Sequence, residues 1–214
     1  MKKIIYLFIC ILFACQGRQE QNNLTSSPKL DTLAKFNDES TKPTSVPSSV
    51  AEIKLAYTAT MQHLAKNDLD SITKSYNCNG ERSGTVTYYH ANARLKLIKH
   101  VYAEYSHHEA TDTYFVLDSS LYFAHLKRLN WSFESGAAKE GATKDDIIEY
   151  RFYLAAGKAI QCLEKKYTIH STSSAASIVE RTPNKTIACN SAPLLKAFEN
   201  LISFGKGDSN CLEK

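Results

Sequence analysis

The chain lacks the motifs that identify most hydrolases, nucleotide-binding proteins and zinc proteins. It contains no Gly-x-Ser-x-Gly sequence, which frames the nucleophile of many serine hydrolases, and no glycine-rich phosphate loop. It also contains no Cys-x-x-Cys pair and neither His-x-x-x-His nor His-Glu-x-x-His, the spacings typical of zinc and thiol redox sites. We therefore expect no cofactor and no metal ion.

No apolar run is long enough to span a membrane as a helix. The run Ile4–Ala14 has 11 residues, whereas a spanning helix needs about 20. It follows the cationic pair Lys2-Lys3 and ends at Ala14, before Cys15. This arrangement predicts a signal peptide over residues 1–14, which is removed from the mature protein.

The end of this run resembles the lipobox of bacterial lipoproteins. The residues are Leu12-Phe13-Ala14-Cys15, in which Phe13 is bulkier than the family's usual residue. The resemblance implies that Cys15 becomes the first mature residue and carries acyl chains such as palmitate. It implies a protein of the bacterial cell envelope, lipid-anchored to the outer membrane rather than the inner one. The alternative is an ordinary secretory signal with an incidental cysteine.

The charge balance is nearly even. The chain has 26 basic and 22 acidic residues, and loss of Lys2 and Lys3 with the signal leaves a net charge near +2. So small an excess favours neither nucleic acid nor electrostatic attraction to a membrane surface. The partners we expect are the membrane, reached through the lipid anchor, and an unknown protein or cell-wall component.

Residues 15–48 have too few apolar side chains to form a core. They are rich in Gln, Asn, Ser, Thr, Pro and Lys, and Phe36 is their single aromatic residue. Such a segment cannot offset its ordering entropy by burial, so we expect a disordered tether with a reach of about 30 Å. Residues 49–214 are long enough for a single α+β domain with its own core.

Helix signals stand at both ends of this domain. Ser49 and Glu52 have the spacing of a capping box, and apolar residues then recur at roughly helical intervals, which predicts a helix over residues 50–75. Near the carboxyl end, Ser191 as a cap, Pro193 in the first turn and Gly205 as a stop predict a second helix.

Between these helices the apolar period changes from helical to alternating, and the pattern repeats. Three aromatic pairs end at Tyr89, Phe115 and Tyr153. Each of these residues is followed six positions later by an apolar residue. Short turns at Ala91-Asn92, Asp118-Ser119 and Ala156-Gly157 separate the two halves of each unit. Three hairpins in sequence predict an antiparallel β-meander of about six strands.

The domain plan is similar to that of a group of uncharacterised small bacterial lipoproteins. The matching features are Tyr88-Tyr89, Tyr114-Phe115 and the segment from Glu149 to Tyr153, followed by Gly157-Lys158. This resemblance implies the same plan of signal peptide, tether, helix, tyrosine-rich meander and closing helix. It implies no activity.

A second resemblance is to small periplasmic inhibitors of lysozyme-type enzymes. Tyr76-Asn77-Cys78, leading into the segment from Thr85 to Tyr88, resembles those disulfide-bearing β proteins. Their Ser-Gly-x-x-Tyr loop is not reproduced, because the tyrosine follows Ser83-Gly84 one residue late. We expect a non-catalytic binding or interaction module, with lysozyme-type inhibition as the alternative.

Four cysteines remain after the signal and the lipid site: Cys78, Cys162, Cys189 and Cys211. An even number in an oxidising compartment predicts up to two disulfides, with three possible connectivities. A Cys189–Cys211 bridge would have to span the last helix with a taut tail. We therefore favour joining either of these to the sheet or first helix through Cys162 or Cys78.

Three residues are candidates for binding. His107 and His108 stand in an expected loop, but neighbours in an extended chain point to opposite sides, which favours a solvated turn over a metal site. Trp131 lies just beyond an expected strand from Leu121 to Leu129. It either caps the sheet or stands exposed as an anchor for a partner.

One pairing raises the rival hypothesis of a hydrolase. If Asp118-Ser119 forms a two-residue turn, Val116 pairs with Leu121 and Asp112 pairs with His125. An Asp–His pair on one face could orient a general base. The same pair could instead be an ordinary cross-strand contact at the edge of the core.

Overall fold

The computed structural model describes residues 45–136, 139–173, 175–207 and 211–212. The expected signal peptide, Cys15 and all but the last four residues of the expected tether lie outside the described residues. No helix within the described ranges is long and apolar enough to cross a membrane.

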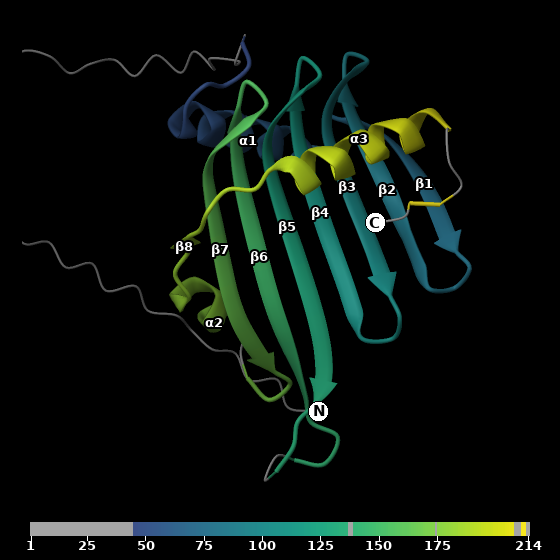
Figure 1. Ribbon diagram of the computed structural model, residues 1–214, viewed down its shortest axis with the longest axis vertical. Coiled ribbons are helices and arrows are strands. Elements are labelled where there is room, and N and C mark those ends of the chain that lie inside the picture. Colours follow the sequence, from purple (N-terminus) through teal and green to yellow (C-terminus); the bar gives the residue numbers. More distant parts are fainter. Residues whose placement is uncertain (1–44, 137–138, 174, 208–210, 213–214) are drawn as a thin grey trace, which may run out of the picture. The chain divides into compact units, whose positions relative to one another are not determined.

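The folded unit is built on an eight-stranded antiparallel sheet in which each strand pairs with the next in sequence (Figure 1). The predicted antiparallel meander is thus confirmed, but the predicted count of about six strands is wrong. The strands are β1 (Asp70–Cys78), β2 (Arg82–Ala91), β3 (Arg94–Glu104), β4 (His108–Leu117), β5 (Ser120–Phe133), β6 (Thr143–Ala155), β7 (Lys158–His170) and β8 (Lys185–Thr186).

The three predicted hairpins share one turn geometry. Their two-residue turns are Asn92-Ala93, Asp118-Ser119 and Ala156-Gly157, with positive φ at every position. Positive φ at both central residues makes a type I′ turn, whose twist matches that of the flanking strands. The first turn lies one residue later than predicted. Each hairpin also has a bulge two residue pairs from its turn, at Tyr89/His90, Phe115/Val116 and Tyr153/Leu154.

The first helix, α1 (Val50–Ala65), begins where the capping box predicts. The Ser49 side chain accepts a bond from the backbone N–H of Glu52, whose carboxylate accepts one from the backbone N–H of Ser49. The helix ends at Ala65, ten residues before the predicted end. The segment around Ile72 is strand β1 instead, because it pairs with β2 over nine residues.

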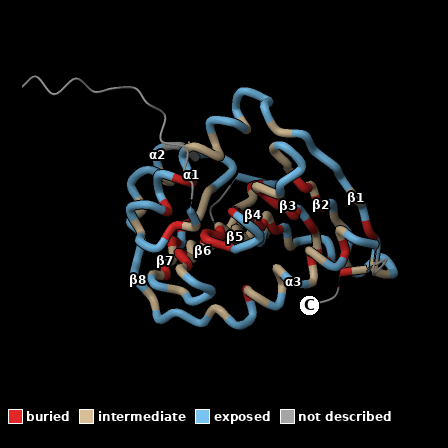
Figure 2. The backbone as a smooth tube through the Cα atoms, turned by 90° about the horizontal axis from the view of Figure 1, so that it is seen from above, coloured by how far each residue is buried: buried red, intermediate tan, exposed pale blue. Residues whose placement is uncertain are grey.

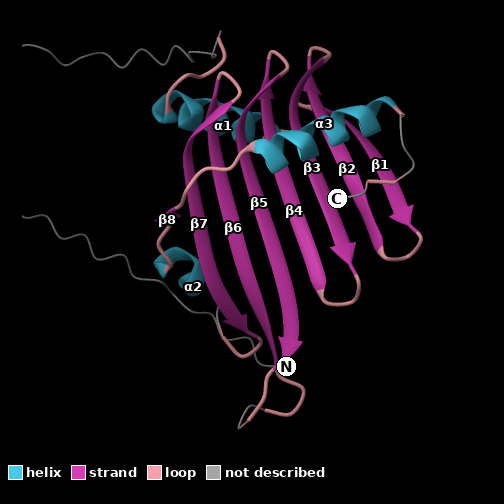
Figure 3. Ribbon diagram, viewed as in Figure 1, coloured by secondary structure: helices cyan, strands magenta, loops and turns pink. Residues whose placement is uncertain are grey.

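Helices cover both faces of the sheet. Figure 2 shows α1 and α2 (Ala175–Arg181) on one side and α3 (Ala192–Lys206) on the other. Ile53 and Ala56 of α1 pack on Leu97, Phe115 and other residues of the face that we call the α1 face. The opposite side of the sheet is the α3 face (Figure 3).

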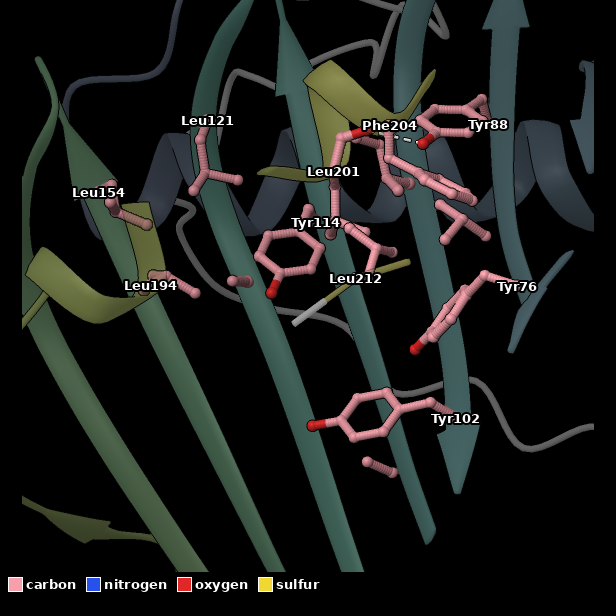
Figure 4. Close-up of a cluster of buried hydrophobic side chains, with 14 residues drawn as sticks. Tyr76, Tyr88, Tyr102, Tyr114, Leu121, Leu154, Leu194, Leu201, Phe204 and Leu212 are labelled. Carbon is pink, nitrogen blue, oxygen red and sulfur yellow. Dashed lines mark hydrogen bonds between the residues drawn. The ribbon is translucent and has the colours of Figure 1, made fainter. Parts of the chain in front are cut away.

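Helix α3 is held on its face by apolar packing and by polar contacts near its end. Leu194, Leu201 and Phe204 are buried against the sheet, and burial of each such side chain stabilises by about 1.5–3 kcal/mol (Figure 4). The hydroxyl of Tyr88 donates to the carbonyl of Leu201 at 2.6 Å. Lys74 Nζ donates to the carbonyl of Gly205 at 2.6 Å, where the helix dipole favours a cation.

The ends of α3 differ in detail from the prediction. Ser191 occupies the cap position but makes no side-chain capping bond. The helix runs past Gly205 to Lys206 and ends at Gly207, whose φ of 98° lies in the left-handed region that glycine adopts without strain.

Two disulfides attach both flanks of α3 to the sheet. Cys162 on β7 joins Cys189, which precedes the helix, and Cys78 on β1 joins Cys211, which follows it. The closed loops span 27 and 133 residues, for which loop-closure entropy predicts about 3–5 kcal/mol each. The helix is therefore fixed across the sheet from one side to the other.

Candidate functional site

A cavity of about 800 Å³ opens between α3 and the sheet, and we call it the α3 hollow. Alternate residues of a strand point to the same side of the sheet. Strands β2 to β6 therefore each supply lining side chains from the same face as the core residues that pack against α3. The sheet residues that line the hollow are Arg82, His100, Tyr102, Asp112, Tyr114, Leu126, Arg128, Tyr150 and Phe152.

One wall of the hollow is apolar. Leu126 and Phe152 come from the sheet, and Leu194, Ala197 and Leu201 come from α3. Asn190, Lys196 and Asn200 add polar groups on the helix side. An apolar wall with a few convergent polar groups is the usual composition of a small-molecule site.

The floor of the hollow contains a buried ion pair. Both terminal nitrogens of Arg128 donate to the carboxylate of Asp112, one of them to Oδ2 at 3.0 Å. The Asp112 side chain is only 6% exposed and that of Arg128 is 24% exposed. Burial raises the pKa of Asp112, and the bonds from Arg128 oppose that rise. A bidentate pair of this kind fixes the guanidinium in one orientation.

A second arginine approaches the same aromatic ring from another strand. The guanidinium carbon of Arg82 lies 4.1 Å from the centre of the Tyr102 ring, and that of Arg128 lies 5.6 Å from it. Arg82 Nε lies 3.3 Å from a carboxylate oxygen of Glu104, a residue that is itself buried. Both guanidinium groups therefore lie within the distance at which a ring face attracts a cation.

His100 extends this cluster toward the edge of the sheet. Its Nε2 is hydrogen-bonded to the hydroxyl of Tyr76 at 2.7 Å, and its ring stacks on Tyr102 with a centroid distance of 4.5 Å. Burial, together with the charges of Arg82 and Arg128, lowers the pKa of His100 to about 3. Burial also raises the pKa of Tyr76 to about 12. Near neutral pH both groups are uncharged.

The carboxyl end of the chain closes one side of the hollow. Leu212 is buried in the core of the α3 face, and its carbonyl accepts a bond from Arg82 at 3.0 Å. The disulfide from Cys78 to Cys211 fixes this segment to β1. The position of Arg82 therefore depends on the covalent closure of the fold.

A larger cavity of about 1010 Å³ lies on the other side of α3, toward the hairpin turns. Its charged residues are exposed; Arg94 and Asp118, for example, lie 3.7 Å apart with side chains 76% and 49% exposed. Solvent screens groups at such a position, so they add little to binding. Arg82 and Arg128 in the α3 hollow are less exposed, with side chains 14% and 24% exposed, which makes the hollow the better candidate.

A second polar cluster lies on the α1 face. Glu149 accepts bonds from Tyr167 at 2.6 Å, from Arg151 at 2.7 Å and from His125 at 3.1 Å. These bonds, that from His125 first, lower the pKa of Glu149 to about 2 against the cost of burial. The carboxylate is buried and fully bonded, so we interpret this cluster as a brace between β5, β6 and β7.

The structure separates Asp112 from His125. Val116 pairs with Leu121 as predicted, but the bulge at Phe115/Val116 shifts the register by one residue. Asp112 therefore pairs with Leu126, and His125 pairs with Thr113. A shift of one residue reverses the face. Asp112 lies on the α3 face and His125 on the α1 face, so the predicted Asp–His pair is wrong.

Trp131 lies within β5, not beyond its end as predicted. Its indole Nε1 donates to the carbonyl of Ser106 at 2.9 Å, and its ring lies 4.0 Å from that of His107. His108 begins β4 and bonds instead to the side chain of Asn130 at 2.8 Å. Trp131 and His107 thus pack together, while His108 is bonded elsewhere. Within the described ranges, no group of three or more His, Cys, Asp or Glu could hold a metal ion.

The residues that resemble lysozyme inhibitors occupy strands. Ser83 and Gly84 lie near the start of β2, where Gly84 pairs with Tyr76 and Tyr102. A Cβ on Gly84 would lie 2.5 Å from the carbonyl oxygen of Val101. Close packing against β3 accounts for this glycine.

Sequence reasoning did not identify Arg82, His100, Tyr102 or Arg128. A signal was present, because each of these residues stands in phase with the buried apolar residues of its strand, as Arg128 does with Ala124. A charged residue at a core-facing position is a stronger indication of a site than an exposed aromatic residue.

Compared with protein-family models, curated proteins and solved structures, the chain has no significant match.

Proposed function

We propose that this chain is a lipid-anchored binding protein of the bacterial envelope that holds a small amphipathic ligand in the α3 hollow. The ligand has an apolar body, which packs on Leu126, Phe152 and α3, and an anionic group, which lies toward Arg82 and Arg128. The convergence of these two arginines on Tyr102 is the observation that carries the proposal.

The size and lining of the hollow support a small-molecule ligand. Its volume of about 800 Å³ falls within the range of typical ligand sites. Arg82, Arg128 and Lys196 are three cationic groups of the lining; Arg82 pairs with Glu104 and Arg128 pairs with Asp112. Arg82 and Arg128 are partly shielded from solvent, with side chains 14% and 24% exposed, and the exposed Lys196 at the rim adds one net positive charge, which favours an anion over a cation.

The chemistry of the lining supports binding rather than catalysis. No serine, threonine or cysteine stands among the described residues that line the hollow. His100 has a pKa of about 3, which makes its imidazole a weak base near neutral pH. The lining can therefore orient a ligand but offers no activated nucleophile.

The proposed location rests on the signal peptide, the resemblance at Cys15 and the cysteine count. Two disulfides suit an oxidising compartment such as the periplasm. An anchored binding protein needs no charge for membrane contact, which agrees with the small net charge of the mature chain.

The test compares two dyes that differ in one group. Anilinonaphthalene sulfonate has an apolar body and an anionic sulfonate, whereas N-phenylnaphthylamine lacks the sulfonate. We expect the full chain to bind the sulfonate dye with an increase in fluorescence, and to bind the uncharged dye about tenfold or more weakly, since a charge-assisted bond contributes about 1.5–3 kcal/mol.

Two tryptophan substitutions on α3 localise the binding. Ala197 lines the hollow and Ala192, which is exposed, does not. Ala197→Trp should abolish binding of the sulfonate dye, and Ala192→Trp should leave it unchanged. Circular dichroism and melting temperature show whether each variant is folded. Equal binding of both dyes would refute an anionic ligand, and binding unaffected by Ala197→Trp would refute the α3 hollow.

A further inference from the structure

The two edges of the sheet are protected to different degrees. At one edge, β8 pairs with Leu163 and Glu164 of β7, and Lys165 of β7 donates to the carbonyl of Val179 in α2. At the other edge, β1 pairs only with β2 among the described residues. Residues 70–73 and 75 of this strand are exposed. An unprotected edge presents backbone donors and acceptors to another strand.

Strand β1 lacks several of the features that usually prevent edge pairing. It contains no proline and no glycine, and its register with β2 is regular over nine residue pairs. Its one lysine, Lys74, points to the α3 face, where it bonds the end of α3. Ile72 is 59% exposed at the centre of the exposed stretch. A long, regular and partly apolar edge of this kind favours strand addition.

We propose that β1 pairs antiparallel with β1 of a second copy of this chain, about a two-fold axis through Ile72. A two-fold axis perpendicular to the sheet keeps equivalent faces on the same side, so a residue can pair only with a partner residue from the same face. Asp70, Ile72 and Lys74 share the α3 face, because their β2 partners continue through Tyr88 and Val86 of its core.

The sequence Asp70-Ser71-Ile72-Thr73-Lys74 is self-complementary in this register. Ile72 faces the partner's Ile72, and Asp70 faces the partner's Lys74, which gives two attractive charge pairs. Ser71 faces the partner's Thr73 on the α1 face, and such hydroxyl pairs hydrogen-bond across strands. Asp70 has no ion-pair partner among the described residues of its own chain, so the partner's Lys74 would be its first.

This charge pattern selects a second copy over an unrelated peptide. A two-fold pairing about Ile72 places Asp70 and Lys74 of each copy opposite a residue of opposite charge. Pairing about Thr73 would instead place Ile72 opposite the partner's Lys74. The inference is independent of the α3 hollow and of its ligand.

The test uses the full chain in the membrane of the producing cells. Directly opposed residues of an antiparallel pair have Cβ atoms about 4.5–5.5 Å apart, close enough for a disulfide after a small adjustment. Ile72→Cys should therefore give a covalent dimer on a non-reducing gel. Ser71→Cys is the matched control, because Ser71 faces the partner's Thr73 and not its own copy.

Charge reversal then tests the register. In the Ile72→Cys background, Asp70→Lys or Lys74→Glu alone turns both attractive pairs into repulsive ones, which should reduce the dimer yield about tenfold or more. Co-expression of the two variants restores opposite charges in both pairs and should restore a mixed dimer. Cross-linking of Ser71→Cys as strong as that of Ile72→Cys, or a yield that charge reversal does not change, would overturn the proposal.

Discussion

Arg128 and Asp112 offer a quantitative test of the site, because removal of one partner leaves the other buried. Arg128→Leu strands a carboxylate that is only 6% exposed. Loss of one member of a buried pair costs about 3–5 kcal/mol. The Arg128 side chain is 24% exposed, so the pair is partly solvated and we expect a cost near the lower limit, about 3 kcal/mol.

The cost should depend on pH in a defined direction. Burial raises the pKa of Asp112, and loss of Arg128 raises it further. An acid whose pKa is higher in the folded than in the unfolded state destabilises the fold when it is ionised. This destabilisation disappears as the pH falls through the folded-state pKa toward the ordinary value of 3.8. The deficit of Arg128→Leu relative to wild type should therefore be largest near pH 7 and shrink on acidification.

Urea unfolding of wild type, Arg128→Leu and the double variant Arg128→Leu with Asp112→Leu measures both effects. The double variant has no stranded charge, so its stability should lie within about 1 kcal/mol of wild type near pH 7, and it should lack the pH-dependent deficit of Arg128→Leu. A deficit for Arg128→Leu below about 1 kcal/mol near pH 7, or one that acidification leaves unchanged, would show that the pair is not a buried brace of the site.

Four further substitutions test other parts of the molecule. Glu149→Gln should reduce stability by about 2 kcal/mol at neutral pH. Because folding lowers the pKa of Glu149 from 4.5 to about 2, the stability that its carboxylate contributes is complete above pH 4.5 and is lost as the pH falls toward 2. The difference from wild type in urea unfolding should therefore vanish as the pH falls from 4.5 to 2. Trp131→Ala should cost about 1–3 kcal/mol, less than for a fully buried tryptophan, and emission from this single tryptophan should show a half-buried indole. Replacing Cys162 and Cys189 together by serine should cost about 3 kcal/mol in thermal unfolding. Cys15→Ala should abolish incorporation of labelled palmitate, and unchanged incorporation would exclude lipidation at this residue.

Local features of the fold could be predicted because they depend on neighbouring residues. The capping box at Ser49 is decided within one helical turn, and the turns at Asp118-Ser119 and Ala156-Gly157 are decided within a hairpin. The six-residue spacing between an aromatic pair and the next apolar residue indicated hairpins correctly, because each hairpin has a two-residue turn and a bulge in this region. None of these features requires a contact with a distant part of the chain.

The first helix shows where local reasoning fails. Ile72 follows Leu64 at an approximately helical spacing, and the pattern alone therefore favours one long helix. The segment instead pairs with residues 82–90, and its backbone hydrogen bonds to β2 replace those of a helix. Tertiary pairing overrides a weak local preference, and no short window of sequence contains that information.

The candidate site was decided by register. The amino-acid sequence determined that acids, histidines and arginines occur along β3, β4 and β5, but not which of them share a face. One bulge beside the Asp118-Ser119 turn moves His125 to the α1 face and leaves Asp112 beside Arg128 in the α3 hollow. Because side chains alternate with a period of two, a single extra residue in a strand exchanges the faces of everything beyond it, and only the paired sheet shows where that residue lies.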